Sequence, residues 1–147
     1  MIIGENANLI KRYLVAAALS QGDMVRYFVE QEGLHPDATF GGKPTALCYT
    51  VLKPHHETMK YLINSGADVD KIDQLGMRPL HYAAMGGCLY CLSYLIACGA
   101  EVNAGSKSGK TALKMTEGKP HLRECREFLL HHGASNTADQ KAMRAFH

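Results

Sequence analysis

The sequence lacks a long apolar segment, a strong net charge and an even number of cysteines. No apolar run in its 147 residues approaches the roughly 20 residues of a membrane span, so we expect none. The net charge of +2 is too small to indicate a nucleic-acid partner. Basic and aromatic residues also do not interleave as they do in single-strand binders. Five cysteines without a convincing secretory signal favour reduced thiols and a cytoplasmic protein.

The small net charge conceals an uneven distribution along the chain. Residues 1–70 contain 6 Lys/Arg and 8 Asp/Glu, whereas residues 71–147 contain 10 and 6. The second half therefore favours an acidic partner surface, although only mildly.

Motifs of catalysis are missing as well. The sequence has no Gly-x-Ser-x-Gly motif. Gly109-Lys110-Thr111 is similar to the end of a phosphate-binding loop, but the earlier glycine of that motif would fall at Ala104, and no strand is expected before it. We find no nucleophile, histidine and carboxylate that a fold would bring together. We therefore predict no enzyme, no catalytic residues and no cofactor.

What the sequence does contain is an internal repeat of about 33 residues. Gly66, Gly99 and Gly133 follow one another at this spacing. Each of the first two begins a Gly-Ala-acid-Val-Asp/Asn segment. Upstream of each glycine is a triplet whose leucine recurs at the same interval: Thr45-Ala46-Leu47, Arg78-Pro79-Leu80 and Thr111-Ala112-Leu113. A fixed period of this length indicates a solenoid of small stacked units.

The landmarks within one period predict two helices. Thr45 and Thr111 can cap the first helix with their hydroxyls, and Pro79 suits the first helical position. A break is expected at Met85-Gly86-Gly87. The second helix then places Leu92, Leu95 and Ile96 on one face and ends at Gly99, where a left-handed residue is needed.

Residues 73–103 resemble an ankyrin repeat in their sequence, DQLGMRPLHYAAMGGCLYCLSYLIACGAEVN. They have the Asp-x-x-Gly turn, the Pro-Leu-His opening, the paired alanines and the Gly-Ala-acid-Val-Asn close, with Arg78 where the family has Thr. Residues 39–70 and 106–135 match more loosely, and 9–33 form an atypical first repeat. The resemblance implies an all-α repeat fold: an ankyrin-type solenoid of helix-turn-helix units joined by projecting β-hairpin-like loops. It predicts a repeat domain over 1–135 and a tail or short capping helix over 136–147.

Cys88 and Cys91 have the C-x-x-C spacing of zinc and redox sites. In this solenoid they fall in the first turn of a second helix, where cysteine packs as a small apolar side chain. A structural zinc needs four converging ligands, and a redox centre a thioredoxin-like setting. His55-His56 and His131-His132 have no thiol or acid clearly nearby, and His121 is no better placed. We therefore predict no metal, and we expect Cys88 to be the most reactive thiol because it begins a helix.

The resemblance implies a structural role for His81, whose imidazole would bond backbone and hydroxyl groups of adjacent turns. It also implies a non-catalytic module, an adaptor or an inhibitor, that binds another protein through its concave face and loop tips. A small metal- or thiol-dependent sensor that uses a cluster of Cys88, Cys91 and Cys98 is the alternative. We expect a monomer, and the opening Met favours a stand-alone chain over a domain of a longer parent. The predicted partner-binding residues are Phe40, Tyr49, Lys53, Lys71, Gln74, Leu75, Met77, Arg78, Tyr82, Met85, Lys107, Ser108 and Lys110.

Overall fold

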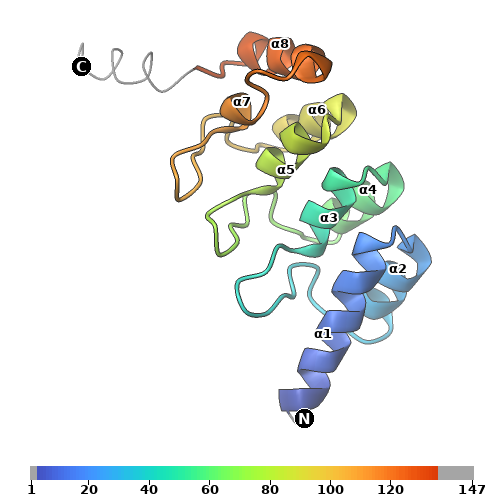
Figure 1. Ribbon diagram of the computed structural model, residues 1–147. Helices are drawn as coiled ribbons and strands as arrows, with labels where there is room; N and C mark the ends of the chain where they lie inside the picture. Colours follow the sequence, from blue (N-terminus) through green and yellow to red (C-terminus); the bar gives the residue numbers. More distant parts are fainter. Residues whose placement is uncertain (1–2, 136–147) are drawn as a thin grey trace.

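The computed structural model describes residues 3–135, and every regular element in that range is helical. The helices come in successive pairs (Figure 1). The elements are α1 (Ile3–Ala18), α2 (Gly22–Glu30), α3 (Ala46–Leu52), α4 (His56–Asn64), α5 (Pro79–Gly86), α6 (Leu89–Ala97), α7 (Ala112–Met115), the 3-10 helix η1 (Pro120–Leu122) and α8 (Arg123–His131). The predicted all-α solenoid is confirmed. The exact repeat boundaries stay a prediction, and the tail predicted over 136–147 lies outside the described residues.

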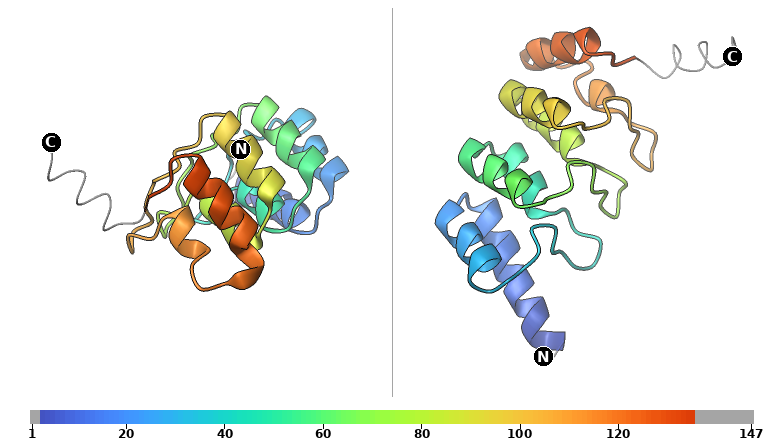
Figure 2. Two further views of the ribbon diagram at one scale, coloured as in Figure 1. Left: turned by 90° about the horizontal axis from the view of Figure 1, so that it is seen from above. Right: turned by 180° about the vertical axis from the view of Figure 1, so that it is seen from behind.

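The pairs stack in chain order into an elongated solenoid (Figures 1 and 2). Helices α1, α3, α5 and α7 lie on the side from which the long loops project, and α2, α4, α6 and α8 lie behind them. Each pair therefore contributes a loop, a first helix and a second helix to three parallel columns. Within residues 3–135, no helix combines the length and the apolar character that crossing a membrane requires.

Most of the predicted helix signals act as expected. Pro79 is the first residue of α5, and the N–H of Lys114 donates to the Thr111 hydroxyl at 3.2 Å. Gly99 follows the end of α6 with a φ of 97°. Thr45 is the exception, because its hydroxyl lies 3.7 Å from the Cys48 sulfur and makes no capping bond. The break after α5 comes at Gly87 and not one or two residues earlier, because the helix runs on through Gly86.

Two series of leucines at the repeat period form the core. Leu47, Leu80 and Leu113 in the first helices are at most 3% exposed. In the second helices, Leu62, Leu95 and Leu129 are all 0% exposed. Each leucine packs within its own layer and against the next, so hydrophobic burial joins neighbouring pairs into one core.

Close helix packing requires a glycine at the end of α5. A Cβ on Gly86 would lie 2.7 Å from the backbone oxygen of Leu52, at the end of α3. A backbone atom cannot move aside as the tip of a flexible side chain can. The reason for this glycine is therefore the close approach of α3 and α5, and not a left-handed backbone.

Hydrogen bonds that recur at the repeat period link adjacent layers in the segments that follow the second helices. The Asp37 carboxylate accepts from the N–H of Asp68 at 3.1 Å, and the Asp70 carboxylate accepts from the N–H of Glu101 at 3.3 Å. Asn103 continues the series, because its Oδ1 accepts from the N–H of Ser135 at 3.0 Å. The Asp/Asn that closes each repeat motif therefore bonds the layer that follows it.

The projecting loops are hairpin-like, although no strand is assigned anywhere in 3–135. The N–H of Asp73 donates to the Met77 carbonyl at 3.0 Å, and the N–H of Ser106 donates to the Lys110 carbonyl at 2.9 Å. Adjacent loops are also joined, because the N–H of Lys107 donates to the Leu75 carbonyl at 2.9 Å. Backbone bonds therefore hold the loop tips in a fixed row.

Candidate functional site

Two open grooves lie between the first helices and the projecting loops. The proximal groove is lined by Lys11, Leu14, Val15, Ala18, Phe40, Lys43 and Tyr49. The distal groove is lined by Leu75, Met77, Met85, Ser106, Lys107, Ser108, Lys110 and Met115. Both have an apolar floor and lysines at the edge, and both open on the loop side of the solenoid.

The distal groove carries flexible apolar side chains that the fold leaves in solvent. Leu75 is 57% exposed at a loop tip, and Met85 is 42% exposed on α5. Unbranched methionine adapts its shape to an apolar partner. Lys107 and Lys110 are exposed at the edge, and no ion pair in the described part of the chain involves either lysine. These ammonium groups are available to an external anion.

The proximal groove centres on Phe40, whose ring is partly buried. The ammonium groups of Lys11 and Lys43 each lie 5.6 Å from the centre of this ring. Cation–π contacts of this kind hold lysine side chains near an aromatic face while leaving the charge accessible. Val15, on α1, is 55% exposed beside them. The proximal groove thus repeats the chemistry of the distal one.

Asp73 builds the loop that separates the two grooves. Its Oδ1 accepts from the N–H groups of Leu75 at 2.8 Å and Met77 at 3.0 Å, and its Oδ2 accepts from the Tyr82 hydroxyl. Burial is the main cause that raises the pKa of the Tyr82 phenol, and the neighbouring Asp73 carboxylate raises it further. The hydroxyl therefore stays protonated and donates, which ties the loop to α5.

His81 fastens the same loop to the following one. Its Nδ1 accepts from the N–H of Arg78 at 2.9 Å, and its Nε2 lies 3.0 Å from the carbonyl oxygens of both Ala104 and Lys110. This pattern requires a neutral ring with its proton on Nε2. The predicted structural role is confirmed, because all of its partners within residues 3–135 are backbone groups and none is a hydroxyl.

Burial lowers the pKa of the His81 imidazole below its usual value. The unfolded chain therefore binds a proton at a pH at which the folded chain does not. We expect the free energy of unfolding to fall as the pH drops below about 6.5, by at most about 1.4 kcal/mol per pH unit from this residue. Denaturant titrations at about pH 7.5 and about pH 5.5 measure the change. A His81→Gln variant should be less stable but should show a smaller loss between the two pH values; an equal loss would exclude His81 as the source.

The structure brings together some of the predicted partner-binding residues and leaves others apart. Two lie in the proximal groove and six in the distal groove, and Gln74 is at the loop tip between them. Met77 and Tyr82, two of the predicted partner-binding residues, are only 8% and 9% exposed and belong to the core. The predicted residues that line neither groove are Lys53, Lys71, Gln74, Arg78 and Tyr82. Sequence reasoning did not identify Lys11, Val15, Lys43 and Met115.

The three cysteines of α6 and its flanks do not form one cluster. Cys88 and Cys91 are joined by a disulfide, so the expectation of reduced thiols is wrong for this pair. Cys98 is free and exposed at the other end of α6, about 15 Å away along the helix axis. It therefore cannot act with the other two, and the three-cysteine cluster of the sensor alternative is excluded.

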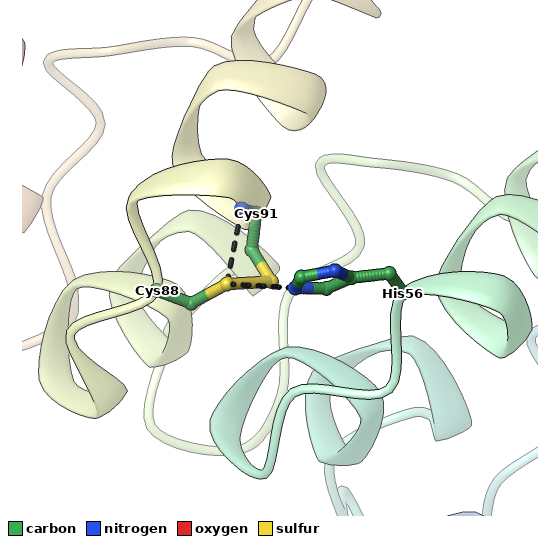
Figure 3. A group of neighbouring side chains, drawn as sticks. All are labelled: His56, Cys88 and Cys91. Atoms are coloured by element: carbon green, nitrogen blue, oxygen red, sulfur yellow. Dashed lines mark hydrogen bonds between the residues drawn. A yellow bond between two sulfur atoms is a disulfide. The ribbon is translucent and has the colours of Figure 1, made fainter.

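A histidine, His56, lies beside the disulfide of Cys88 and Cys91. Figure 3 shows its ring pointing from the start of α4 towards the two sulfurs at the start of α6. Its Nε2 lies 3.6 Å from the Cys88 sulfur. The expectation that no cysteine side chain lies near His55-His56 is therefore wrong, although the sulfur belongs to a disulfide and not to a thiol. Residues one period apart lie one above the other in a solenoid, and Cys88 follows His56 by nearly one period, so the period itself could have identified the pair.

Comparisons with known proteins agree with this architecture. The family model described as ankyrin repeats (3 copies) matches residues 13–106 and 47–140. Human ankyrin repeat domain-containing protein 37 is 42% identical over 69 residues, 46% of this chain and 42% of that protein. Mouse protein phosphatase 1 regulatory subunit 27 is 32% identical over 93 residues, 62% of this chain and 60% of that protein. Human transient receptor potential cation channel subfamily A member 1 is 34% identical over 85 residues, 58% of this chain and 8% of that protein.

The matched segments thus cover less than two thirds of each of these relatives. What they share with the chain is the repeat stack.

Proposed function

Because the chain belongs to the ankyrin-repeat family, whose repeats generally mediate protein–protein interaction, we propose that it is a non-catalytic module that binds a partner protein through its loop side. The partner segment would lie along the loop tips and first helices and fill the proximal and distal grooves. We propose that the chain acts as an adaptor or an inhibitor, alone as a monomer, in the cytoplasm. The mouse relative is named as a phosphatase regulatory subunit, which is consistent with such a role.

The chemistry of the grooves specifies the partner further. Lys11, Lys43, Lys107 and Lys110 are exposed and take part in no ion pair within residues 3–135, and they border apolar floors. A partner segment that places bulky apolar side chains in the grooves and carboxylates against the lysines complements both features. We therefore propose an acidic segment with large apolar residues. This combination of lysines and exposed apolar side chains is the observation that supports the proposal.

A peptide library displayed on phage tests this specificity directly. We expect the wild-type protein to enrich peptides in which Asp or Glu flanks Leu, Ile, Met or an aromatic residue. A Lys107→Glu/Lys110→Glu variant should bind a selected peptide at least about tenfold more weakly, and wild-type binding should weaken with added salt. Fluorescence anisotropy with a labelled peptide measures both effects.

The matched control changes the same charge elsewhere. Lys119→Glu/Arg123→Glu replaces two exposed basic residues that line neither groove and were not predicted to bind a partner, and it should bind the peptide within about twofold of wild type. Enriched peptides without acidic residues, or equal losses in both double variants, would refute the proposed partner chemistry. Circular dichroism of each variant verifies that it is folded.

A further inference from the structure

We propose that His56, Cys88 and Cys91 form a binding site for a thiophilic divalent cation, Zn²⁺, when the two cysteines are reduced. The three donor atoms lie within 4.8 Å of one another, and they come from two adjacent layers of the solenoid. Imidazole nitrogen and thiolate sulfur are the donors that Zn²⁺ prefers. The site lies where α4 and α6 begin and shares no residue with either groove, so it is independent of the proposed partner binding.

The geometry around Cys88 suits a metal ion. With a Zn–S bond of about 2.3 Å and a Zn–N bond of about 2.05 Å, a tetrahedral site separates the sulfur and nitrogen by about 3.6 Å. The distance from Cys88 Sγ to His56 Nε2 is 3.6 Å. The backbone N–H of Cys91 also donates to Cys88 Sγ at 3.1 Å, as the sulfur caps α6. A donated N–H and the start of a helix both stabilise a thiolate, which is the ligand form of cysteine.

The His56 ring is held in place to act as a ligand. It stacks on the Tyr90 ring of α6, with centroids 4.2 Å apart and planes 26° from parallel. This contact holds the ring in its orientation. Figure 3 shows that in this orientation the ring points towards the two sulfurs. Cys88 is 7% exposed and Cys91 is 0% exposed, whereas His56 is exposed. A cation can therefore enter from the His56 side, and three protein ligands leave the fourth position to water.

The disulfide and the metal site exclude each other. A low-molecular-weight thiol reduces the bond: two thiol molecules become one disulfide, and Cys88 and Cys91 become two thiols. Zn²⁺ then displaces the two thiol protons and binds two thiolates and the neutral imidazole. Oxidation of the pair by a small-molecule disulfide reverses the sequence and releases the ion. The filled site has a net charge of zero, because the two thiolates neutralise the divalent cation and the imidazole is neutral.

The experiment titrates Zn²⁺ into the full-length, chelator-treated protein kept reduced with a phosphine, in competition with a chromogenic chelator. We expect one Zn²⁺ per chain and, with Co²⁺ in its place, a thiolate-to-cobalt charge-transfer absorption. His56→Ala should weaken Zn²⁺ binding at least about tenfold, since loss of groups that merely support a ligand already costs about 10–100-fold. Protein oxidised with glutathione disulfide should bind no Zn²⁺ at this site.

The matched controls are Cys98→Ser and His121→Ala, which remove an exposed thiol and an exposed imidazole elsewhere and should bind Zn²⁺ as wild type does. Cys88→Ser should abolish the charge-transfer band. His56 is exposed, so His56→Ala is expected to fold, and circular dichroism verifies this. Failure of the reduced wild type to bind Zn²⁺ stoichiometrically, or equal affinity of His56→Ala and wild type, would overturn the proposal and leave only a disulfide.

Discussion

Replacing Leu92 with alanine is expected to lower the free energy of unfolding by about 3–5 kcal/mol. Leu92 is 0% exposed in α6 and belongs to the continuous core. Its truncation removes apolar contacts and leaves a cavity. Because each layer contacts only its neighbours, a cavity in α6 weakens the packing against both the preceding and the following pair. Urea denaturation with linear extrapolation measures the change.

Leu89→Ala is the matched control, because it makes the same substitution in the same helix. Leu89 is 37% exposed, so its truncation should cost about 1 kcal/mol or less. If the two variants lost equal stability, the burial that distinguishes the two leucines would not be what stabilises the stack.

Replacing Asp73 with alanine is expected to cost about 2–4 kcal/mol of stability. The carboxylate accepts bonds from two backbone N–H groups and from the Tyr82 hydroxyl, and it is 8% exposed. Alanine accepts none of them, so three donors lose their partner in a largely buried setting. The loop around residues 73–77 should exchange its amide hydrogens faster, and hydrogen-exchange mass spectrometry detects this.

Asp23→Ala provides the comparison for Asp73. Asp23 is an exposed aspartate in the first turn of α2, where it contributes only through the helix dipole. Its loss should cost about 0.3–1 kcal/mol. A stability loss for Asp73→Ala no larger than this would contradict the role of Asp73 as the organiser of the loop.

The sequence period predicted the helix pairs because a solenoid repeats its physical requirements. The second, third and fourth layers each bury a leucine from both helices and follow the second helix with a left-handed glycine, so the leucines aligned with Leu80 and Leu95 and the glycine aligned with Gly99 recur at the period. Pro79 and Thr111 mark the starts of first helices for local reasons: proline lacks the N–H that the first helical residue would leave unbonded, and the threonine hydroxyl caps a free N–H. Such signals are readable from one chain because the same constraint acts in every layer.

The burial of the loop side chains was not predictable in the same way. Met77 lies two residues after the exposed Leu75 and yet is buried, as is Tyr82 on α5, and the Asp73 carboxylate accepts from the N–H of Met77 and from the Tyr82 hydroxyl. The bond to the Met77 N–H recurs one period later, where the Ser106 hydroxyl accepts from the N–H of Lys110 at 3.3 Å, but a serine stands there in place of an aspartate, so the residues themselves do not repeat. The grooves were missed in part for a similar reason, since Lys11 and Val15 come from the atypical first pair, whose register the period does not fix.

His56 was overlooked although the period contained the information. His56 and Cys88 come from different layers and not from one helix, and a solenoid places residues one period apart one above the other. The same rule relates Asp37, Asp70 and Asn103, each of which bonds the layer that follows it. A known period therefore predicts contacts between residues of adjacent layers that lie about one period apart in the sequence.

The most direct test of the central claim is a map of the surface that a selected acidic peptide protects. Amide chemical shifts of the labelled protein, recorded as the peptide is added, locate the contact residue by residue. We expect the changes to concentrate at residues 40–43, 74–77 and 106–110 and along α1, α3, α5 and α7, with little change on the outer faces of α4, α6 and α8. Changes centred on those outer faces, with the loop tips unaffected, would contradict binding through the loop side.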